Sequence, residues 1–417
     1  MSMRLLKTAA AAASLVFMQM ASAQSQSVEV MHWWTSGGEG AAVGVLKKDL
    51  ESKGIKWVDM AVAGGGGEAA MTALRARAVA GNPPTAAQLL GMAVTDWSNE
   101  GFLTDLNEVA NKEGWDKVVP AGIQRFGKQN GKWVAAPVNI HRPHWLWMNA
   151  KIFKDNGLTP PKTWAEFNAI ADKLKAKGIT PLAMGGQPWQ EATIWEGMVL
   201  GMGGPDFYQK AVIQADPASL KSDTMVKVFD QMRKTRGYVD RNFAGRDWNL
   251  ATGMVIKGEA AMQLMGDWAK GEVIAAKLTP GKEILCSVAP QTQGSFLFNT
   301  DFFAMFKVSN DRRPAQLAMA SSVMNPVFQE TFNLAKGSIP ARTDVSGAKF
   351  DECGQKSMAD LKTASAAGHV YGSLAHGHGQ PAAIQRAYLD VITKHFNSDM
   401  SSKQAVEELA QAVAAAK

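Results

Sequence analysis

Tryptophans with polar neighbours are the residues of this chain best suited to chemistry with a ligand. The sequence holds 13 Trp against 4 Tyr, and a buried indole N–H needs a hydrogen-bond partner. Trp33 and Trp34 are adjacent and precede Glu39, and Trp268 follows a Gly-Asp pair. Flat rings edged by polar side chains suit a hexose, which has two relatively apolar faces and a perimeter of hydroxyl groups. The pattern favours a sugar site, although each ring taken alone is more often a core residue.

Signatures of catalysis and of metal binding are few. The sequence has no G-x-S-x-G, H-E-x-x-H or Walker motif and no G-x-G-x-x-G after a predicted strand. The glycines at 64–67 could hold a phosphate at a helix N-terminus, but Glu68 would repel an anion there, which favours a flexible turn. His376 and His378 resemble a metal-binding pair without a third ligand. We therefore expect no cofactor and no metal. The sequence does not decide whether two carboxylates are paired for glycoside hydrolysis, because the distance between them depends on the fold.

Length and composition are those of a soluble globular protein. The 417 residues are 46% hydrophobic and 20% charged, which suffices for two domains with cores of their own and excludes disorder, collagen and a bare coiled coil. The net charge of +6 is spread thinly over the chain. Without a basic block, nucleic acid is not an expected partner.

Residues 1–23 predict a secretory signal peptide. Arg4 and Lys7 precede an apolar run, and Ala21-Ser22-Ala23 forms a small-residue cleavage pattern. The run of about a dozen residues is shorter than the ~20 needed to span a bilayer, which argues against a membrane anchor. No Cys follows the cleavage site. We therefore expect a free periplasmic protein of a two-membrane bacterium.

The cysteines predict one covalent crosslink. Cys286 and Cys353 are the two cysteines of the sequence, and in an oxidising compartment such a pair favours a disulfide over two thiols. Closing a loop of this length would stabilise the fold by about 4 kcal/mol in the chain-entropy model.

The elements that must position the rings alternate between strands and helices. Apolar strands are predicted at 28–34, 55–63 and 86–90, with amphipathic helices after each of them, and this alternation indicates βαβ units and a mainly parallel sheet. Ligands of such sheets bind where the strands end at their carboxyl side. Residues 32–39 and Gln88 are therefore predicted to share one rim.

Several segments of the chain resemble a known family. The marks are VEVMHWWTSGGE (28–39), WMNAKIFKDNGLTPPKTWAEF (147–167), GEAAMQLMGDWAKG (258–271), AKGSIPARTDV (335–345) and LAHGHGQPAA (374–383). The mature chain is similar over its whole length to the sugar-binding components of ABC importers, and most closely to the glucose-binding periplasmic proteins of Gram-negative bacteria. The first and last segments are the narrower marks and favour monosaccharides.

The resemblance implies an α/β fold of the two-lobe periplasmic binding protein type (type II-like). Each lobe is then a sheet flanked by helices, and crossing hinge segments join the two lobes, which close on the ligand. The N-terminal lobe would comprise residues 24–138 and 302–345. The C-terminal lobe would comprise residues 139–301 and 346–417.

The resemblance also implies a set of substrate-binding residues. Trp34 and Trp268 would sandwich a pyranose from opposite lobes, with Trp33 beside them. The full predicted set is Trp33, Trp34, Glu39, Gln88, Trp268, Asn299, Asp301, Lys336 and His376. His376 is preferred to His378, and His141 has either a cleft or a hinge role. The apolar Leu90 occupies a rim position where a polar contact would be useful. The tryptophans expected in the core or in packing between lobes are Trp145, Trp147, Trp164, Trp189 and Trp195.

The function implied is that of a non-enzymatic receptor. It would bind a monosaccharide, glucose first, in the periplasm and deliver it to the permease subunits of an ABC transporter in the inner membrane. The chain is expected to be a monomer. The alternatives are a receptor for a disaccharide or another sugar in the same fold, and a secreted glycoside hydrolase that uses Glu39 and Asp301.

Overall fold

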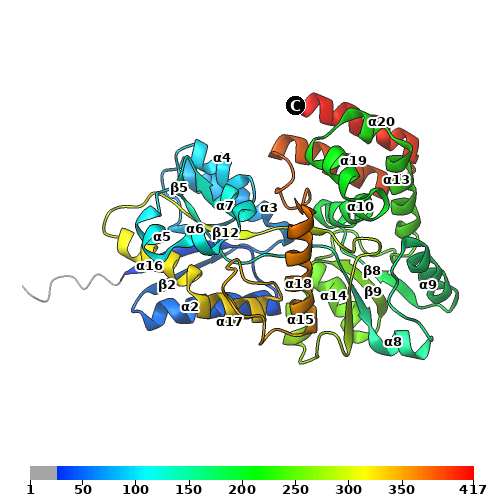
Figure 1. Ribbon diagram of the computed structural model, residues 1–417, viewed down its shortest axis with the longest axis horizontal. Coiled ribbons are helices and arrows are strands. Elements are labelled where there is room, and N and C mark those ends of the chain that lie inside the picture. Colours follow the sequence, from blue (N-terminus) through cyan, green and yellow to red (C-terminus); the bar gives the residue numbers. More distant parts are fainter. Residues whose placement is uncertain (1–25) are drawn as a thin grey trace, which may run out of the picture.

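The computed structural model describes residues 26–417, so the predicted signal peptide, residues 1–23, lies outside the described residues. Two lobes lie side by side, each built on a sheet of its own (Figure 1). The predicted two-lobe α/β architecture is confirmed. The residue boundaries of the lobes stay a prediction.

The first lobe is organised around a sheet with the strand order β2-β1-β3-β12-β6. Its strands are β1 (Ser27–His32), β2 (Lys56–Ala61), β3 (Ala86–Leu90), β6 (Ala135–Pro137) and β12 (Asp301–Met305). β1 is parallel to β2 and β3 as predicted, whereas β12 is antiparallel to both of its neighbours. This register pairs Asp301, the first residue of β12, with Leu90, the last residue of β3. Asp301 therefore lies at the rim where β1 and β3 end.

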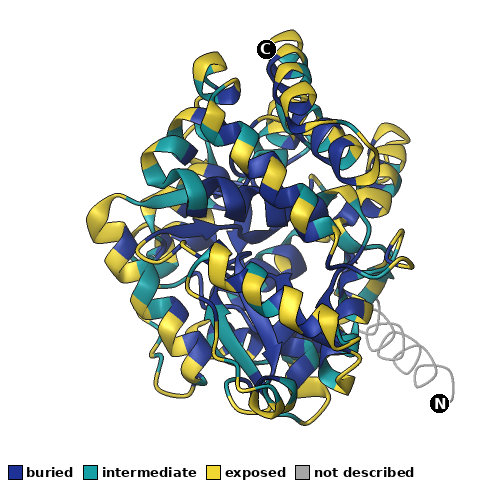
Figure 2. Cartoon of the chain, turned by 90° about the vertical axis from the view of Figure 1, so that its right-hand side faces the viewer, coloured by how far each residue is buried: buried dark blue, intermediate teal, exposed yellow. Residues whose placement is uncertain are grey.

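Amphipathic helices pack around this sheet. They are α2 (Gly37–Ser52), η1 (Gly65–Gly67), α3 (Glu68–Val79), α4 (Ala93–Asn99), α5 (Asn107–Glu113), α6 (Trp115–Val118), α7 (Ala121–Gly127), α16 (Arg313–Met324) and α17 (Pro326–Lys336), with a ribbon of β4 (Lys128–Gln129) and β5 (Lys132–Trp133). In α3, Ala70, Leu74 and Ala78 are buried at a spacing of four residues, which places them on one helix face. Such faces point inward and the exposed faces point to solvent (Figure 2).

The second lobe has a sheet with the order β10-β7-β9-β8. Its strands are β7 (Trp145–Asn149), β8 (Thr180–Ala183), β9 (Ala260–Met265) and β10 (Ile284–Val288). Only β8 and β9 pair in parallel, because β7 runs against both β9 and β10. The predicted parallel pairing therefore holds for β1, β2 and β3, but only two of the four neighbour pairs of the first sheet and one of the three of the second are parallel.

Helices surround the second sheet as well. They are α8 (Ala150–Asp155), α9 (Trp164–Ala176), α10 (Pro188–Gly203), α11 (Pro205–Tyr208), η2 (Gln209–Ile213), α12 (Pro217–Leu220), α13 (Asp223–Arg236), α14 (Trp248–Lys257), α15 (Ala269–Ala275), α19 (Ala382–Asn397) and α20 (Ser402–Ala416). Among the described residues, no helix combines the length and the apolar character that crossing a membrane requires.

The lobes are joined by segments that cross side by side. Ile140 bridges to Ile339, and His141 bridges to Asn299, so three stretches that are distant in sequence meet between the lobes. Close by, β11 (Phe296–Phe298) pairs in parallel with β13 (Val370–Gly372). His141 and Asn299 are thereby held at the junction of the two sheets.

A disulfide fixes α18 (Glu352–Ala367), which lies between the lobes in Figure 1. Cys286 on β10 and Cys353 on α18 are bonded, with their Cα atoms 6.2 Å apart, which confirms the predicted crosslink. Met358 and Leu361 of the same helix pack against the core of the first lobe. The disulfide thus ties the second sheet to a helix that also contacts the first lobe.

Candidate functional site

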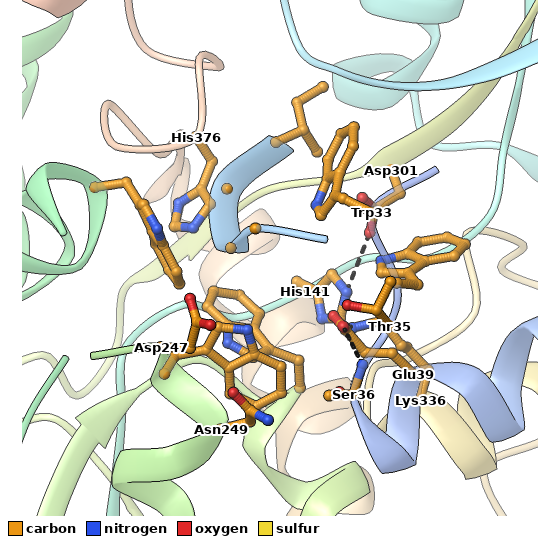
Figure 3. A pocket seen from close by; sticks show the side chains of 18 of the residues that line it. Trp33, Thr35, Ser36, Glu39, His141, Asp247, Asn249, Asp301, Lys336 and His376 are labelled. Atoms are coloured by element: carbon orange, nitrogen blue, oxygen red, sulfur yellow. Dashed lines mark hydrogen bonds and ion pairs between the residues drawn. The ribbon is translucent and has the colours of Figure 1, made fainter. Parts of the chain in front are cut away.

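A cavity of about 130 Å³ lies between the two lobes, at the rim where β1 and β3 end (Figure 3). Eight of the nine predicted site residues line it, namely Trp33, Trp34, Glu39, Trp268, Asn299, Asp301, Lys336 and His376. The lobes also contact each other around it. The Gly38 N–H donates to Glu272 Oε1 of α15 at 2.8 Å, and the Met92 N–H donates to the Gly377 carbonyl oxygen at 2.9 Å.

The end of β1 supplies the rings of the first lobe. Trp34 packs edge-on against Phe303, with ring centroids 5.7 Å apart, and against Phe332 at 5.4 Å. The ammonium of Lys336 lies 5.6 Å from the Trp34 ring centroid, within reach of a cation–π interaction. Trp34 is therefore held by protein contacts on one side and lines the cavity.

Trp268 brings an aromatic surface from the second lobe. It follows β9 and directly precedes α15, and its ring centroid lies 5.2 Å from that of His141 and 5.2 Å from that of His376. Trp34 and Trp268 thus line one shared cavity although they belong to opposite lobes. Their contact with a sugar stays a prediction.

Three of the four glycines at 64–67, namely Gly65, Gly66 and Gly67, pack against tryptophans of the two lobes. A Cβ at Gly67 would lie 2.7 Å from the Trp33 ring, and a Cβ at Gly66 would lie 2.8 Å from the Trp189 ring. Both glycines also have a φ near +78° (+79° and +77°), which other residues rarely adopt. The glycines therefore allow a loop of the first lobe to lie flat on aromatic rings.

Trp189 was predicted to lie in the core or in packing between lobes, and its contact with Gly66 of the first lobe is such packing. It is half-buried and lines the cavity, with its ring centroid 6.1 Å from that of Trp268 and 5.8 Å from that of His376. The side chains of Trp145, Trp147, Trp164 and Trp195 are buried core residues, as predicted.

Other lining residues were missed by the sequence reasoning. They are Thr35, Ser36, Asp247, Trp248 and Asn249, together with the glycine loop. Asp247, Trp248 and Asn249 lie where α14 begins, and Trp248 had the same available signal as Trp268: a tryptophan beside an aspartate. Thr35 and Ser36 follow Trp34 directly and fall within the predicted rim. Leu90 also lines the cavity and leaves this part of the rim apolar.

A buried ion pair closes the first-lobe side of the cavity. Lys336, the last residue of α17, places Nζ 3.2 Å from Glu39 Oε1. Glu39 lies in the first turn of α2, where the helix dipole favours a carboxylate. Both side chains are buried. A buried ion pair with further hydrogen-bonding capacity suits the hydroxyl groups of a polar ligand.

Asp301, His141 and Asp267 contact one another in sequence between the two lobes. Asp301 Oδ2 accepts a hydrogen bond from Asn139 Nδ2 at 2.8 Å and lies 3.2 Å from His141 Nε2, while His141 Nδ1 contacts Asp267 Oδ1. Burial alone would raise the pKa of Asp301, but the hydrogen bond and charge of His141 and the charge of Lys336 outweigh it and lower that pKa to about 2. Asp301 is therefore an ionised acceptor.

His141 links the two lobes in this chain. Burial lowers the pKa of its imidazole, but the charges of Asp267 and the hydrogen bonds to Asp267 and Asp301 outweigh burial and raise the pKa. Asp267 follows β9 of the second lobe, whereas Asp301 begins β12 of the first. Of the two roles predicted for His141, the structure shows both a cavity contact and a position in the hinge.

Gln88 is the predicted site residue that does not line the cavity. Its Nε2 donates to Asp301 Oδ1 at 2.7 Å, and its Oε1 accepts from the Trp33 N–H at 3.2 Å. The side chain has no exposed surface. Gln88 therefore supports two lining residues from beneath, because an amide can donate and accept at once.

Three buried polar atoms among the lining residues have no hydrogen-bond partner. They are Ser36 Oγ, Asn299 Oδ1 and His376 Nε2. Buried polar groups in proteins nearly always have a partner. All three belong to residues that line one cavity, which suits a ligand that offers hydrogen-bonding groups.

The two histidines near the C-terminal segment have separate environments. His376 lines the cavity, and His378 lies behind it, where its Nε2 accepts from the Thr300 N–H at 3.1 Å and its ring packs on Phe126 and Phe298. Within residues 26–417, no group of three or more His, Cys, Asp or Glu side chains is placed to hold a metal ion.

Comparisons with known proteins agree with this geometry. Residues 34–319 match the family of bacterial extracellular solute-binding proteins. A probable sugar-binding periplasmic protein of Rhizobium meliloti is 56% identical over 415 residues, covering 100% of both chains. A glucose-binding protein of Saccharolobus solfataricus is 23% identical, over 57% of this chain and 45% of its own length.

Among solved structures, a bacterial solute receptor described with an exclusive preference for β-D-galactopyranose is similar to this chain. The TM-score is 0.76 at 17% sequence identity, and the match covers 94% of this chain and 97% of the receptor. At this identity the likeness shows the fold, which is the two-lobe fold of sugar receptors.

Proposed function

The chain belongs to the bacterial extracellular solute-binding protein family, and from this premise we propose that it binds one monosaccharide, glucose first, between its lobes. It is a periplasmic sugar-binding receptor of an ABC transporter and not an enzyme. The sugar-loaded protein would deliver its ligand to the permease subunits in the inner membrane, which would recognise the closed arrangement of the lobes.

One observation carries the monosaccharide proposal. Tryptophan rings of both lobes line one cavity, and three polar atoms of its lining residues are buried without a hydrogen-bond partner. Rings suit the C–H faces of a pyranose, and the polar atoms suit its hydroxyl groups. The 56% identical relative from Rhizobium meliloti is named for sugar binding, and the more distant relative from Saccharolobus solfataricus is named for glucose.

The two carboxylates considered for catalysis, Glu39 and Asp301, do not suit glycoside hydrolysis. Such enzymes need one carboxyl group with a raised pKa as proton donor, whereas the pKa of Asp301 is lowered to about 2. Glu39 forms an ion pair with Lys336 instead of facing a second carboxyl group. Asp301 and Glu39 therefore act as fixed acceptors.

A cavity between two lobes can supply the binding free energy that micromolar affinity for a hexose requires. Micromolar affinity corresponds to about −8 kcal/mol. Spread over the roughly 12 non-hydrogen atoms of a hexose, this is about −0.7 kcal/mol per atom, which is below the ceiling for small ligands. Closure is then a shift of population toward the form that the sugar binds more tightly.

Titration calorimetry with a panel of sugars tests the proposal. Glucose, mannose, galactose, xylose, maltose and raffinose are titrated into the mature protein. We expect one site per chain and a Kd for glucose at or below about 1 µM, the range in which such receptors are useful. Binding of maltose or raffinose with no binding of any monosaccharide would contradict it.

A disaccharide is the second candidate, and a neighbouring cavity favours it. This cavity of about 160 Å³ shares Trp33, Leu90 and His376 with the first. Ala93, at the start of α4, lines only the second cavity. An Ala93→Phe variant should therefore weaken maltose binding and leave glucose binding unchanged if a second sugar ring occupies that space.

A further inference from the structure

A buried hydrogen-bond chain reaches the cavity from the core of the second lobe. Ser373 Oγ lies 2.5 Å from Glu196 Oε1 on α10, and His376 Nδ1 lies 2.8 Å from Ser373 Oγ. On the other side of the same ring, His376 Nε2 is buried without a hydrogen-bond partner, and His376 is one of the residues that line the cavity. Glu196 has no exposed surface and takes no part in the proposed function.

The first member of the chain is a carboxylate that only accepts. The Leu374 N–H and the Ala375 N–H donate to Glu196 Oε2 at 2.6 and 3.3 Å. His144 Nε2 lies 3.3 Å from Glu196 Oε1 and 3.0 Å from the Thr193 carbonyl oxygen, so it carries a hydrogen. Burial alone would raise the pKa of Glu196, but the hydrogen bond and charge of His144 outweigh burial and lower it.

The directions of the next two hydrogen bonds follow from proton counting. Ser373 has one hydroxyl hydrogen, and it donates this hydrogen in its hydrogen bond to the carboxylate of Glu196. Ser373 Oγ must then accept from His376, so Nδ1 of His376 carries the ring hydrogen. Burial, which outweighs the charge of Glu196, lowers the pKa of His376 to about 3. A neutral imidazole has a single N–H, and Nε2 is therefore a lone pair.

We propose that Glu196 and Ser373 are positioning residues that fix the tautomer of His376, so that Nε2 faces the cavity as a hydrogen-bond acceptor. The ligand then has to place a hydroxyl donor against Nε2. This step deepens the proposed function and rests on it for the ligand. A sugar in which fluorine or a methoxy group replaces that hydroxyl is rejected, since a buried acceptor would be left without its donor.

Nuclear magnetic resonance of the ligand-free protein reads the tautomer directly. With ¹⁵N-labelled histidine, protonated and lone-pair ring nitrogens have well separated chemical shifts, and His376→Gln identifies the signals. We expect a protonated Nδ1 and a lone pair at Nε2 in the wild type, and a shift toward protonated Nε2 in Ser373→Ala. A wild-type Nε2–H, or an unchanged tautomer in Ser373→Ala, would overturn the proposal.

A double-mutant cycle with D-glucose tests whether Ser373 acts through His376. We expect Ser373→Ala to weaken binding about tenfold, Ser373→Thr to restore it to within about threefold, and Ser373→Ala to have no further effect in a His376→Ala background. Equal losses in both backgrounds would refute the positioning role.

The matched control is Ser357→Ala on α18. Ser357 is 1% exposed, its Oγ has no partner, and it lies outside the cavity lining, so we expect glucose binding to be unchanged. An absence of glucose binding in the wild type would contradict the proposed ligand alone, because the spectrum of the ligand-free protein still decides the tautomer. Near-equal binding of the five singly deoxyfluorinated glucoses, substituted at C1, C2, C3, C4 or C6, would contradict the requirement for a donor.

Discussion

The two sides of the cavity differ in how they contribute to it. On the first-lobe side, Trp34 rests on phenylalanines, and the charged groups Glu39, Lys336 and Asp301 are already paired with protein partners. On the second-lobe side, the rings of Trp189 and Trp268 lie against His376. The first side is a prearranged set of charges, and the second side is mainly an aromatic surface.

This difference indicates a division of labour in binding. Charged hydrogen-bond partners act strongly only when they are held in place, which the sheet and α17 of the first lobe provide. An aromatic surface gains contact in proportion to the apolar area that it covers, which closure of the second lobe would supply. Substitutions on the two sides should therefore differ in size and in kind.

The largest effect is expected for Asp301→Ala. It removes an ionised acceptor for sugar hydroxyl groups and leaves Asp267 as the one carboxylate beside the buried His141, so glucose binding should weaken about a hundredfold. Calorimetry measures the loss. The control is Asp59→Ala, which breaks another His-Asp contact, His32 Nε2 to Asp59 Oδ1 at 2.8 Å, away from the cavity. Near-normal affinity of Asp301→Ala would contradict the proposal that charged residues of the first lobe bind the sugar.

Trp268→Ala should have the next largest effect, a loss of about tenfold or more in glucose affinity, because the ring provides the main second-lobe surface. Trp57 is the matched control, since it is 6% exposed like Trp268 but lies outside the cavity lining. Trp57→Ala should lower the melting temperature and leave affinity unchanged. Equal affinities of the two variants would contradict the proposal that the Trp268 ring contacts the sugar.

Trp189→Ala should weaken glucose binding by a smaller factor, about threefold to fivefold. Its ring is only half-buried in the structure, so less apolar contact is lost with it. The comparison of Trp189→Ala with Trp268→Ala in one calorimetric series ranks the rings of the second lobe. A larger loss for Trp189→Ala would place the sugar nearer to α10 than the account has it.

The smallest effect on binding is expected for Glu191→Gln, which should instead change stability with pH. Burial raises the pKa of Glu191 on α10 to about 7. The folded protein then binds a proton that the unfolded chain releases above about pH 4.5, so stability falls as pH rises toward 7 and beyond, by about 3 kcal/mol in total.

Glu191→Gln removes this loss. Unfolding by urea should show the variant to be more stable than the wild type at pH 8 and similar to it at pH 5. An equal difference at both values would contradict the shifted pKa. Glu196, on the same helix, shows the opposite case: it has several donors, whereas Glu191 accepts from Asn397 and has one oxygen without a partner.

Local sequence patterns carried much of this account. The end of a predicted strand placed Trp33 and Trp34 at the rim, and the count of cysteines predicted the bond between Cys286 and Cys353. Such features depend on short stretches of chain or on composition, so they need no knowledge of tertiary contacts. The resemblance to a family supplied Lys336 and His376, which no local pattern singles out.

Long-range register limited the rest. Asp301 reaches the rim because β12 pairs with β3 across more than two hundred residues, and no local pattern encodes that pairing. Gln88 was predicted at the rim because it lies on a strand that ends there. Its side chain instead lies beneath Trp33 and Asp301, to which it is hydrogen-bonded. Trp189 looks like a helix-core residue in sequence, and its place at the cavity depends on contacts with Trp268, His376 and the glycine loop that no local pattern encodes.

The central claim is that both lobes contact one pyranose in the cavity between them. A crystal structure of the mature protein grown with D-glucose tests this most directly. We expect one sugar ring in contact with Trp268, with a hydroxyl group within hydrogen-bond distance of Asp301. A sugar bound elsewhere, or one that touches a single lobe, would contradict it.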